Sequence, residues 1–188
     1  MKEVLYSTKF LDFVASKRED KPDWVYAHRP NAKDVVIIVP LIHRKDGDYT
    51  LFLITKRPPI VEEYGEKYCI EFPAGLVGDE DKEETVDLAL KKELLEETGY
   101  EAQTFRVMVK NMVSSGGLSS EKSTLAIGEI YDLEKKAVPV DDGGVIIDRI
   151  EVPLDEIDKF LDEMQLKNCF ICAQTLAGVY YLQKSNVK

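Results

Sequence analysis

Two β-branched runs joined by a short turn constrain this chain more than any other feature of its sequence. Residues 34–42 read DVVIIVPLI and residues 49–57 read YTLFLITKR. Both runs have strand length, and the polar, glycine-containing RKDGD between them is typical of a tight turn. We therefore predict a β-hairpin over residues 34–57.

Further strand and helix patterns surround this hairpin. Strands are expected at 68–77, ending at Pro-Ala-Gly, and at 104–113, 123–133 and 144–153. Helices are expected at 83–98, 153–164 and roughly 169–184. A sheet interrupted by one central helix and followed by two more predicts an α/β sandwich, with helices packed on the faces of a mixed sheet.

The size and charge of the chain restrict its class. Its 188 residues suit one domain with at most a small appendage. A net charge of -10, from 25 basic and 35 acidic residues, argues against binding to a nucleic-acid backbone. Charges interrupt the apolar residues at the N-terminus, and no apolar run is long enough to span a membrane. We expect a cytoplasmic protein with no nucleic-acid or membrane partner.

The three cysteines do not form a disulfide framework. Cys169 and Cys172 form a C-x-x-C motif, which could be redox-active or bind a metal. No histidine lies nearby in the sequence, and the motif begins an apolar helical pattern where a redox pair would follow a strand. We expect both to be buried thiols of the last helix.

Three carboxylates crowd the end of the central helix. Glu93, Glu96 and Glu97 lie in its last turn, and Gly99 is typical of the residue just past a helix end. Carboxylates are unfavourable there, because the carbonyl end of the helix dipole is negative. A solvated charged face is the usual fate of such a run.

A helical wheel argues against that usual fate. Glu93 and Glu97 fall in the apolar sector that holds Leu90 and Leu94, and Glu96 lies beside Ala89. Clustered carboxylates raise one another's pKa unless a cation compensates them. Mg²⁺ or Mn²⁺, which prefer oxygen ligands, would do so. The helix end is therefore predicted to be a metal platform.

This segment resembles the Nudix box, the metal-binding loop–helix–loop of hydrolases that cleave a nucleoside diphosphate linked to another group. The family pattern is G-x5-E-x7-R-E-U-x-E-E-x-G-U, where U is a bulky aliphatic residue. Here Gly78 and Glu84 are followed by KELLEETGY at 92–100. Lys92 replaces the family's arginine, which keeps the charge but loses the bidentate fork. Tyr100 replaces the final aliphatic residue.

Other segments resemble ADP-ribose pyrophosphatases and related ADP-sugar hydrolases. YCIEFPAGLV at 68–77 is similar to their segment before the box, and TKRPPI places Arg57 at their Q-x-R-x-P strand end. Trp24 and Arg29 match their W-x4-R, and SSGGLSSE puts Glu121 at the acidic position of their S-P-G-x-S-x-E loop.

The resemblance implies a Mg²⁺-dependent enzyme, with Mn²⁺ as a possible substitute, that cleaves the pyrophosphate bond of an ADP-sugar. Glu93, Glu96 and Glu97 would hold the metal with the carbonyl of Ala74. In relatives a late-loop glutamate often serves as the general base that takes a proton from the attacking water. This chain has no glutamate at the corresponding position, so Glu121 or a box glutamate becomes the candidate base.

The resemblance also implies a homodimer. Residues 1–32 would form a strand region exchanged between protomers, and residues 33–188 the Nudix domain. Trp24 and Arg29 would contact the adenine end of the partner's substrate, and Arg57 would clamp phosphate. An indole stacks on a purine and an arginine grips a diphosphate, although each could also be an ordinary packing or surface residue.

Two alignments compete before the box. Aligning on PAGL pairs Ala74-Gly75 with the family's Ala-Gly, whereas the box spacing selects Gly78. Treating these as exclusive, we favour PAGL for the metal-binding carbonyl and the KELLEETG end for the helix.

The late-loop glutamate of relatives has no counterpart. Val145 stands at that position, and Asp141 or Asp142 could reach in, although DDGG is more simply a hairpin turn. Two other functions remain open. The chain could act on another nucleotide sugar, a dinucleotide or a nucleotide, or it could be a catalytically silent domain that binds ADP-ribose-like ligands as a sensor.

Overall fold

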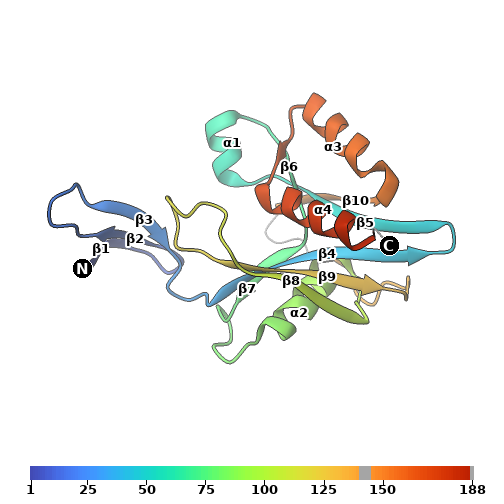
Figure 1. Ribbon diagram of the computed structural model, residues 1–188, viewed down its shortest axis with the longest axis horizontal. Helices are drawn as coiled ribbons and strands as arrows, with labels where there is room; N and C mark the ends of the chain where they lie inside the picture. The colour runs from blue at the N-terminus through green and yellow to red at the C-terminus, as the bar shows by residue number, and fades with distance from the viewer. Residues whose placement is uncertain (140–144, 187–188) are drawn as a thin grey trace.

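An eight-stranded mixed sheet forms the body of the molecule over residues 1–139 and 145–186, which the computed structural model describes (Figure 1). Its strand order is β11-β6-β5-β4-β9-β8, with β10 paired to β5 and β7 to β4. The strands are β4 (Asp34–Arg44), β5 (Gly47–Thr55), β6 (Cys69–Glu71), β7 (Ala74–Val77), β8 (Thr104–Met112), β9 (Ser123–Ile130), β10 (Ile146–Pro153) and β11 (Phe170–Ile171).

Helices cover both faces of this sheet. They are α1 (Pro58–Tyr64), α2 (Val86–Thr98), α3 (Ile157–Leu166) after the 3-10 turn η1 (Leu154–Glu156), and α4 (Ala173–Asn186). Figure 1 shows α2 on one face, with α3 and α4 on the other. None of the described helices is long and apolar enough to cross a membrane.

The alternation of side chains along β4 creates the two layers. Ile37, Val39 and Leu41 join the apolar cluster that includes residues of α3 and α4. Val36, Ile38 and Ile42 join the cluster that includes residues of α2. Because successive side chains of a strand point to opposite faces, one uninterrupted apolar run supplies both cores. The predicted α/β sandwich is confirmed.

The hairpin of β4 and β5 is also confirmed. Arg44 pairs with Gly47 across a two-residue turn, and the antiparallel register continues to Ile42 and Tyr49. On its other edge β4 pairs in parallel with β9, from Val35 opposite Ser123 to Ile42 opposite Ile130. The hairpin is thus the centre of the sheet.

The predicted strand 68–77 is wrong as a single element. It divides into β6 and β7, with Phe72 and Pro73 between them. Pro73 has no N–H to continue a ladder, and its carbonyl accepts from the Ile38 N–H at 2.8 Å. The chain therefore leaves β5 and re-pairs with β4, where Ala74 lies opposite Ile37.

The last helix begins later than predicted. Residues 170–171 form β11, which pairs in parallel with β6, and α4 starts at Ala173. Cys169 and Cys172 therefore flank a short strand and are only half-buried, so the expectation of buried helix thiols is wrong. Pairing with β6 determines this, and β6 lies about 100 residues earlier in the sequence.

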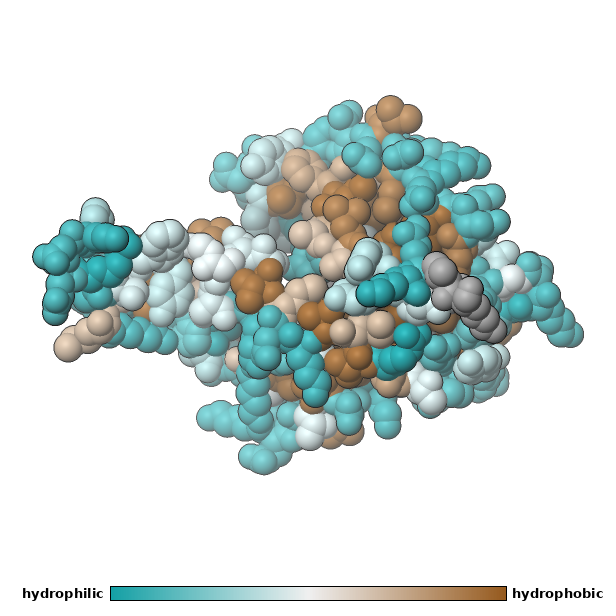
Figure 2. All heavy atoms as spheres, in the orientation of Figure 1, coloured by the Kyte–Doolittle hydropathy of each residue, from teal (hydrophilic) through white to brown (hydrophobic). Residues whose placement is uncertain are grey.

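A separate antiparallel sheet precedes the body. It contains β1 (Lys2–Ser7), β2 (Asp12–Ser16) and β3 (Trp24–His28), and it projects from the body as an arm (Figure 1). A bridge between Ala27 and Ser119 connects it to the loop before β9. On the face shown in Figure 2, the end of the arm is mostly hydrophilic, whereas apolar residues gather over the body.

Candidate active site

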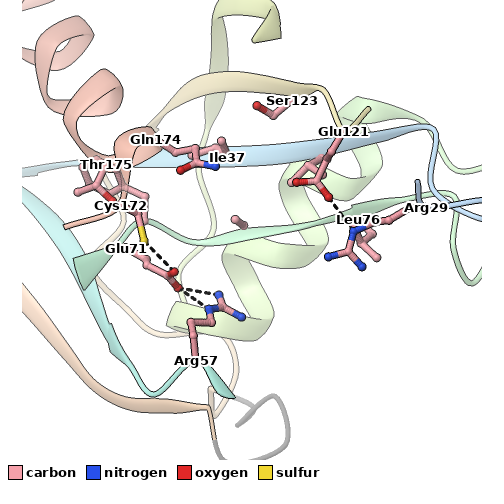
Figure 3. Close-up of a pocket in the computed structure, with 13 residues that line it drawn as sticks. Arg29, Ile37, Arg57, Glu71, Leu76, Glu121, Ser123, Cys172, Gln174 and Thr175 are labelled. Carbon is pink, nitrogen blue, oxygen red and sulfur yellow. Dashed lines mark hydrogen bonds and ion pairs between the residues drawn. The ribbon is translucent and has the colours of Figure 1, made fainter. Parts of the chain in front are cut away.

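A cavity of about 490 Å³ lies where the arm, β6, β7 and the start of α4 meet. Its lining includes two arginines, two glutamates, one backbone segment of β7 and one thiol (Figure 3): Arg29, Arg57, Glu71, Glu121, Ala74 and Cys172. Figure 3 shows the two arginines reaching the cavity from different elements. The cavity therefore brings two cationic and two acidic side chains together.

Arg57 is held by Glu71 on the neighbouring strand. Its Nε and Nη2 atoms both donate to Oε2 of Glu71, at 2.8 and 2.6 Å (Figure 3). Burial acts to lower the pKa of Arg57, but the hydrogen bond to Glu71 outweighs it and raises the pKa. A guanidinium has five N–H donors, so Arg57 keeps others that could bind a phosphate.

Arg29 and Glu121 form a second pair. Arg29 follows β3 in the arm, Glu121 lies in the loop before β9, and Arg29 Nε donates to Glu121 Oε2 at 2.6 Å. This pair closes the arm side of the cavity (Figure 3). The structure thus brings Arg29, Arg57 and Glu121 to one cavity, although they are distant in the sequence.

Helix α2 brings its carboxylates against β7. Glu97 is only 7% exposed, as its place in the apolar sector of the helix predicted. Its Oε2 atom accepts the backbone N–H of Ala74 at 2.9 Å. Ala74 also lines the cavity, so the acidic end of α2 lies directly behind the cavity wall.

Glu93 packs against Gly75, which no other residue could replace without displacement. A Cβ atom at Gly75 would lie 1.9 Å from the carboxyl carbon of Glu93. Burial raises the pKa of Glu93 to about 7, and nearby Lys92 only partly offsets this effect. Because an ionised carboxylate is unstable without a compensating charge, Glu93 favours either a proton or a cation.

Lys92 forms its hydrogen bond with the loop before the helix. Its Nζ donates to Oε2 of Glu80 at 2.8 Å. Glu96 is half-buried on the same turn as Glu93. The lysine therefore anchors this loop, and it acts on Glu93 and Glu96 through its charge.

The two competing alignments are compatible in the structure, so treating them as exclusive was wrong. Ala74 and Gly75 contact Glu97 and Glu93, as the PAGL alignment expects. The N–H of Gly78 donates to Oε2 of Glu84 at 2.8 Å, so the box spacing also has a structural counterpart.

Trp24 lies outside this cavity. It is half-exposed on β3, and its indole N–H donates to the Gly117 carbonyl at 2.8 Å. Of the late-loop candidates, Asp141 and Asp142 lie outside the described residues. Val145 precedes β10, and its carbonyl accepts the Lys56 N–H at 2.8 Å.

Sequence reasoning missed several residues of the site. Glu71 belongs to the YCIEFPAGLV segment, and its place two residues before PAG was the available signal. Arg149 on β10 donates to the Glu97 carbonyl, which fixes the end of α2. Cys69 and Cys172 lie beside Glu71, a contact that no local motif predicted.

The end of α2 gathers oxygen donors of the kind that bind a divalent cation, with the desolvated Glu93 against Gly75 and the buried Glu97 on the Ala74 N–H. In the part of the chain that the structure describes, however, Glu93, Glu96 and Glu97 do not bring their ligand atoms within 4.8 Å of one another. Carboxylate and carbonyl oxygens are the donors that Mg²⁺ and Mn²⁺ prefer.

Comparisons with known proteins identify relatives in both sequence and structure. No family model matches the chain. Over 147 residues it is 29% identical to a methanol dehydrogenase activator of Bacillus methanolicus, covering 76% of this chain and 75% of that protein. It is 29% identical over 97 residues to an ADP-sugar pyrophosphatase of Mus musculus, covering 51% of this chain but only 41% of that protein.

A third relative and one solved structure complete the comparison. The chain is 42% identical over 69 residues to an ADP-ribose pyrophosphatase of Saccharomyces cerevisiae, covering 36% of this chain and 26% of that protein. A crystal structure of an ADP compounds hydrolase superposes with a TM-score of 0.65 and 17% identity, covering 98% of this chain and 90% of that one. At this identity the superposition establishes the fold.

Proposed function

We propose that this chain is a Nudix hydrolase that cleaves the pyrophosphate bond of ADP-ribose or a related ADP-sugar, because it is similar in sequence to pyrophosphatases of these substrates and shares the fold of an ADP compounds hydrolase. The products would be AMP and a sugar phosphate. Water supplies the oxygen that attacks one phosphorus, the bridging P–O bond breaks, and the second phosphate leaves.

One observation carries this proposal. Ala74 lines the cavity, and its backbone N–H donates to Glu97 of α2. The acidic end of the helix and the arginine-lined cavity are therefore two sides of one wall. A diphosphate in the cavity would meet cationic side chains on one side and the metal-binding carboxylates of α2 on the other.

Mg²⁺, or Mn²⁺, bound by Glu93, Glu96, Glu97 and the Ala74 carbonyl would neutralise diphosphate charge and make bound water more acidic. Arg57, oriented by Glu71, would grip phosphate with its remaining N–H groups. Glu121, held by Arg29, would take the proton of the attacking water, unless a box glutamate does so.

The arm would complete the site in a homodimer. Residues 1–32 would form the dimerising strand region and residues 33–188 the hydrolase domain. Trp24 presents half of its surface to solvent and would stack on adenine in the partner's cavity, whereas Arg29 would act at the cavity of its own subunit, which it lines. The arm is a three-stranded sheet that projects from the body, and contact with a second subunit would stabilise it.

A substrate panel tests the proposal. The protein is incubated with Mg²⁺ and ADP-ribose, other ADP- and UDP-sugars, diadenosine polyphosphates or nucleoside triphosphates, and AMP or phosphate is measured. We expect the fastest turnover with ADP-ribose or another ADP-sugar. Faster turnover of another class would support a different Nudix substrate, and ADP-ribose binding without turnover would support the silent sensor.

A further inference from the structure

Two cysteines that the proposed hydrolysis does not use meet Glu71, the partner of Arg57, beside the cavity. The ligand atoms of Cys69, Glu71 and Cys172 all lie within 4.8 Å of one another. Cys172 Sγ and Glu71 Oε1 are 3.1 Å apart (Figure 3). Within residues 1–139 and 145–186, no other group of three histidine, cysteine or acidic residues converges this closely.

The backbone builds this cluster through the register of two strands. Phe170 lies opposite Cys69 and Ile171 opposite Ile70 in the parallel pair of β11 and β6. Cys172 follows, with its N–H directed to the Ile70 carbonyl at 3.3 Å. Because side chains alternate along strands, Cys69 and Glu71 share one face of β6, and Cys172 meets them from the next strand.

The start of α4 fixes the same register. Thr175 is buried, and its hydroxyl donates to the Ile70 carbonyl at 2.9 Å. The Thr175 N–H in turn donates to the Cys172 carbonyl at 3.0 Å. The two thiols are therefore held on adjoining elements by several hydrogen bonds, which makes their proximity part of the fold.

The two oxygens of the Glu71 carboxylate have different partners. Oε2 accepts from Arg57 and from the Thr55 hydroxyl, whereas Oε1 faces the Cys172 thiol (Figure 3). Oε1 is thus available to a ligand that replaces the thiol proton, while the Arg57 pair stays intact. Cys172 and Glu71 line the cavity, so an ion can reach the cluster from solvent. Cys69 closes its inner side at 1% exposure.

The charges of the cluster balance when a divalent cation exchanges for two protons. Two thiols, one carboxylate and one guanidinium carry no net charge. With both thiols deprotonated, the added divalent cation restores the same neutrality, so binding leaves no unpaired charge beside the core. No electron transfer is involved, because each S–H bond gives its electron pair to the metal and its proton to solvent.

We propose that Cys69, Cys172 and Glu71 bind one thiophilic divalent cation, for which Zn²⁺ is the best match. Two thiolates and a carboxylate are ligands that Zn²⁺ accepts, with a fourth position open to the cavity. Tetrahedral zinc places two sulfurs about 3.8 Å apart, within the present spacing after small side-chain rotations. Mg²⁺ prefers oxygen donors, so this site and the carboxylates of α2 select different metals.

Cobalt substitution tests this site independently of turnover. The protein, kept reduced by a phosphine and with Mg²⁺ in excess, is titrated with Co²⁺ and then with Zn²⁺. We expect one equivalent of Co²⁺ to produce a thiolate-to-cobalt charge-transfer band in the near ultraviolet, and one equivalent of Zn²⁺ to remove it. A carboxylate site on α2 gives no such band, so failure of the proposed hydrolysis would leave this result unchanged.

Cysteine variants locate the ligands. Cys69→Ser and Cys172→Ser should lose the band and bind Zn²⁺ at least ~100-fold more weakly, beyond the usual effect of outer-shell changes. Cys169→Ser, which removes the third thiol but leaves the cluster, should keep both properties. A wild-type protein without the band, or equal Zn²⁺ affinity in all three variants, would overturn the proposal.

A measurement on the unaltered protein guards against variants that misfold. Zn²⁺ should protect Cys69 and Cys172, but not Cys169, from an alkylating reagent, and peptide mass spectrometry identifies the modified residues. Equal alkylation of Cys69 and Cys172 with and without Zn²⁺ would contradict the assigned ligands.

Discussion

Charged groups at the cavity are held by partners from other elements. Arg29 in the arm pairs with Glu121 before β9, and Arg57 after β5 pairs with Glu71 on β6. A guanidinium held in one orientation loses less side-chain entropy when it binds phosphate. The residue types therefore match the proposed ligand, and their partners provide the orientation.

Replacing Arg57 by lysine tests the need for that orientation. Arg57→Lys keeps the charge but loses the planar donor pattern, so kcat/KM for ADP-ribose should fall by about 10- to 100-fold. Steady-state kinetics measures the loss. Arg106→Lys on β8, which does not line the cavity, is the matched control and should retain wild-type kinetics. Equal kinetics in both variants would remove Arg57 from the proposed phosphate site.

His43 forms a charged cluster away from the cavity. Its Nδ1 lies 2.9 Å from Asp48 and its Nε2 lies 2.7 Å from Glu129, and its ring stacks on Tyr131. Burial acts to lower the pKa of His43, but hydrogen bonds to Glu129 and Asp48 outweigh it and raise the pKa above 6.5. The cluster therefore stabilises the protonated ring.

This arrangement makes stability depend on pH. The folded state holds the His43 proton more tightly than the unfolded state, so its contribution is fully present below pH 6.5 and is lost as pH rises through the folded pKa. Denaturant unfolding at several pH values should show a loss of about 1 kcal/mol or less, which His43→Gln abolishes. A pH dependence that persists in His43→Gln would exclude this cluster as its cause.

Helix α2 is delimited by local signals and completed by distant contacts. Thr85 caps its start by accepting the Leu88 N–H, and Gly99 ends it in a left-handed conformation with φ 79°. Both caps are readable from the sequence. The acidic last turn is stabilised by two contacts with residues distant in the sequence. The Ala74 N–H of β7 donates to the Glu97 carboxylate, and Arg149 donates to the Glu97 carbonyl.

Removing the Glu93 charge should affect activity and stability in opposite directions. Glu93→Gln is expected to lower turnover on the order of 100-fold or more, because a metal ligand contributes several kcal/mol. Without divalent cations, the folded state keeps the Glu93 proton up to about pH 7, whereas an ordinary glutamate loses it near 4.5. The wild-type protein therefore loses stability as pH rises through this interval, and the variant does not.

Thermal unfolding at pH 8 measures the second effect. In EDTA, Glu93→Gln should unfold at a higher temperature than the wild type, and added Mg²⁺ should narrow or reverse the difference. Glu101→Gln, exposed just after the helix, is the control and should show neither effect. A variant less stable than the wild type in EDTA would mean that Glu93 serves the fold.

At the scale of the whole molecule, the arm presents apolar side chains to solvent. Exposed apolar side chains occur on all three of its strands and in the turn between the first two: Val4, Leu5, Tyr6, Phe10, Phe13 and Trp24. A surface of this kind is typical of a protein–protein contact. It supports the proposed homodimer, in which the arm would reach the partner's cavity.

Mixing inactive variants tests whether the arm acts on the partner. In the proposed dimer each site takes Glu97 from its own subunit and Trp24 from the partner. A heterodimer of Trp24→Ala and Glu97→Gln would therefore contain one intact site and one site that lacks both residues. After subunit exchange, an equal mixture should regain roughly a quarter of wild-type activity at low substrate concentration, since half of the dimers are mixed. A mixture of Glu93→Gln and Glu97→Gln, both within one subunit's site, should regain nothing. Activity no higher than the mean of the separate variants would place Trp24 outside the partner's site.

Local patterns predicted most of the elements, and contacts between elements explain the errors. The β4–β5 hairpin and helix α2 were predicted because turn and cap residues lie within each segment. The division of 68–77 and the start of α4 at Ala173 were not, because pairing with β4 and β6 decides both. The predicted roles of the site residues remain predictions, although Arg29, Arg57 and Glu121 do line one cavity.

The sequence by itself determined the alternation that buries both faces of the sheet, the ends of the central helix and the carboxylates gathered there. These properties follow from the order of residue types over one or two turns of helix or a single strand. Only the tertiary structure decided which partners those carboxylates and arginines meet, and that Cys69, Glu71 and Cys172 lie together. Strand pairing brings segments about 100 residues apart within a few ångströms, and no local pattern specifies that register.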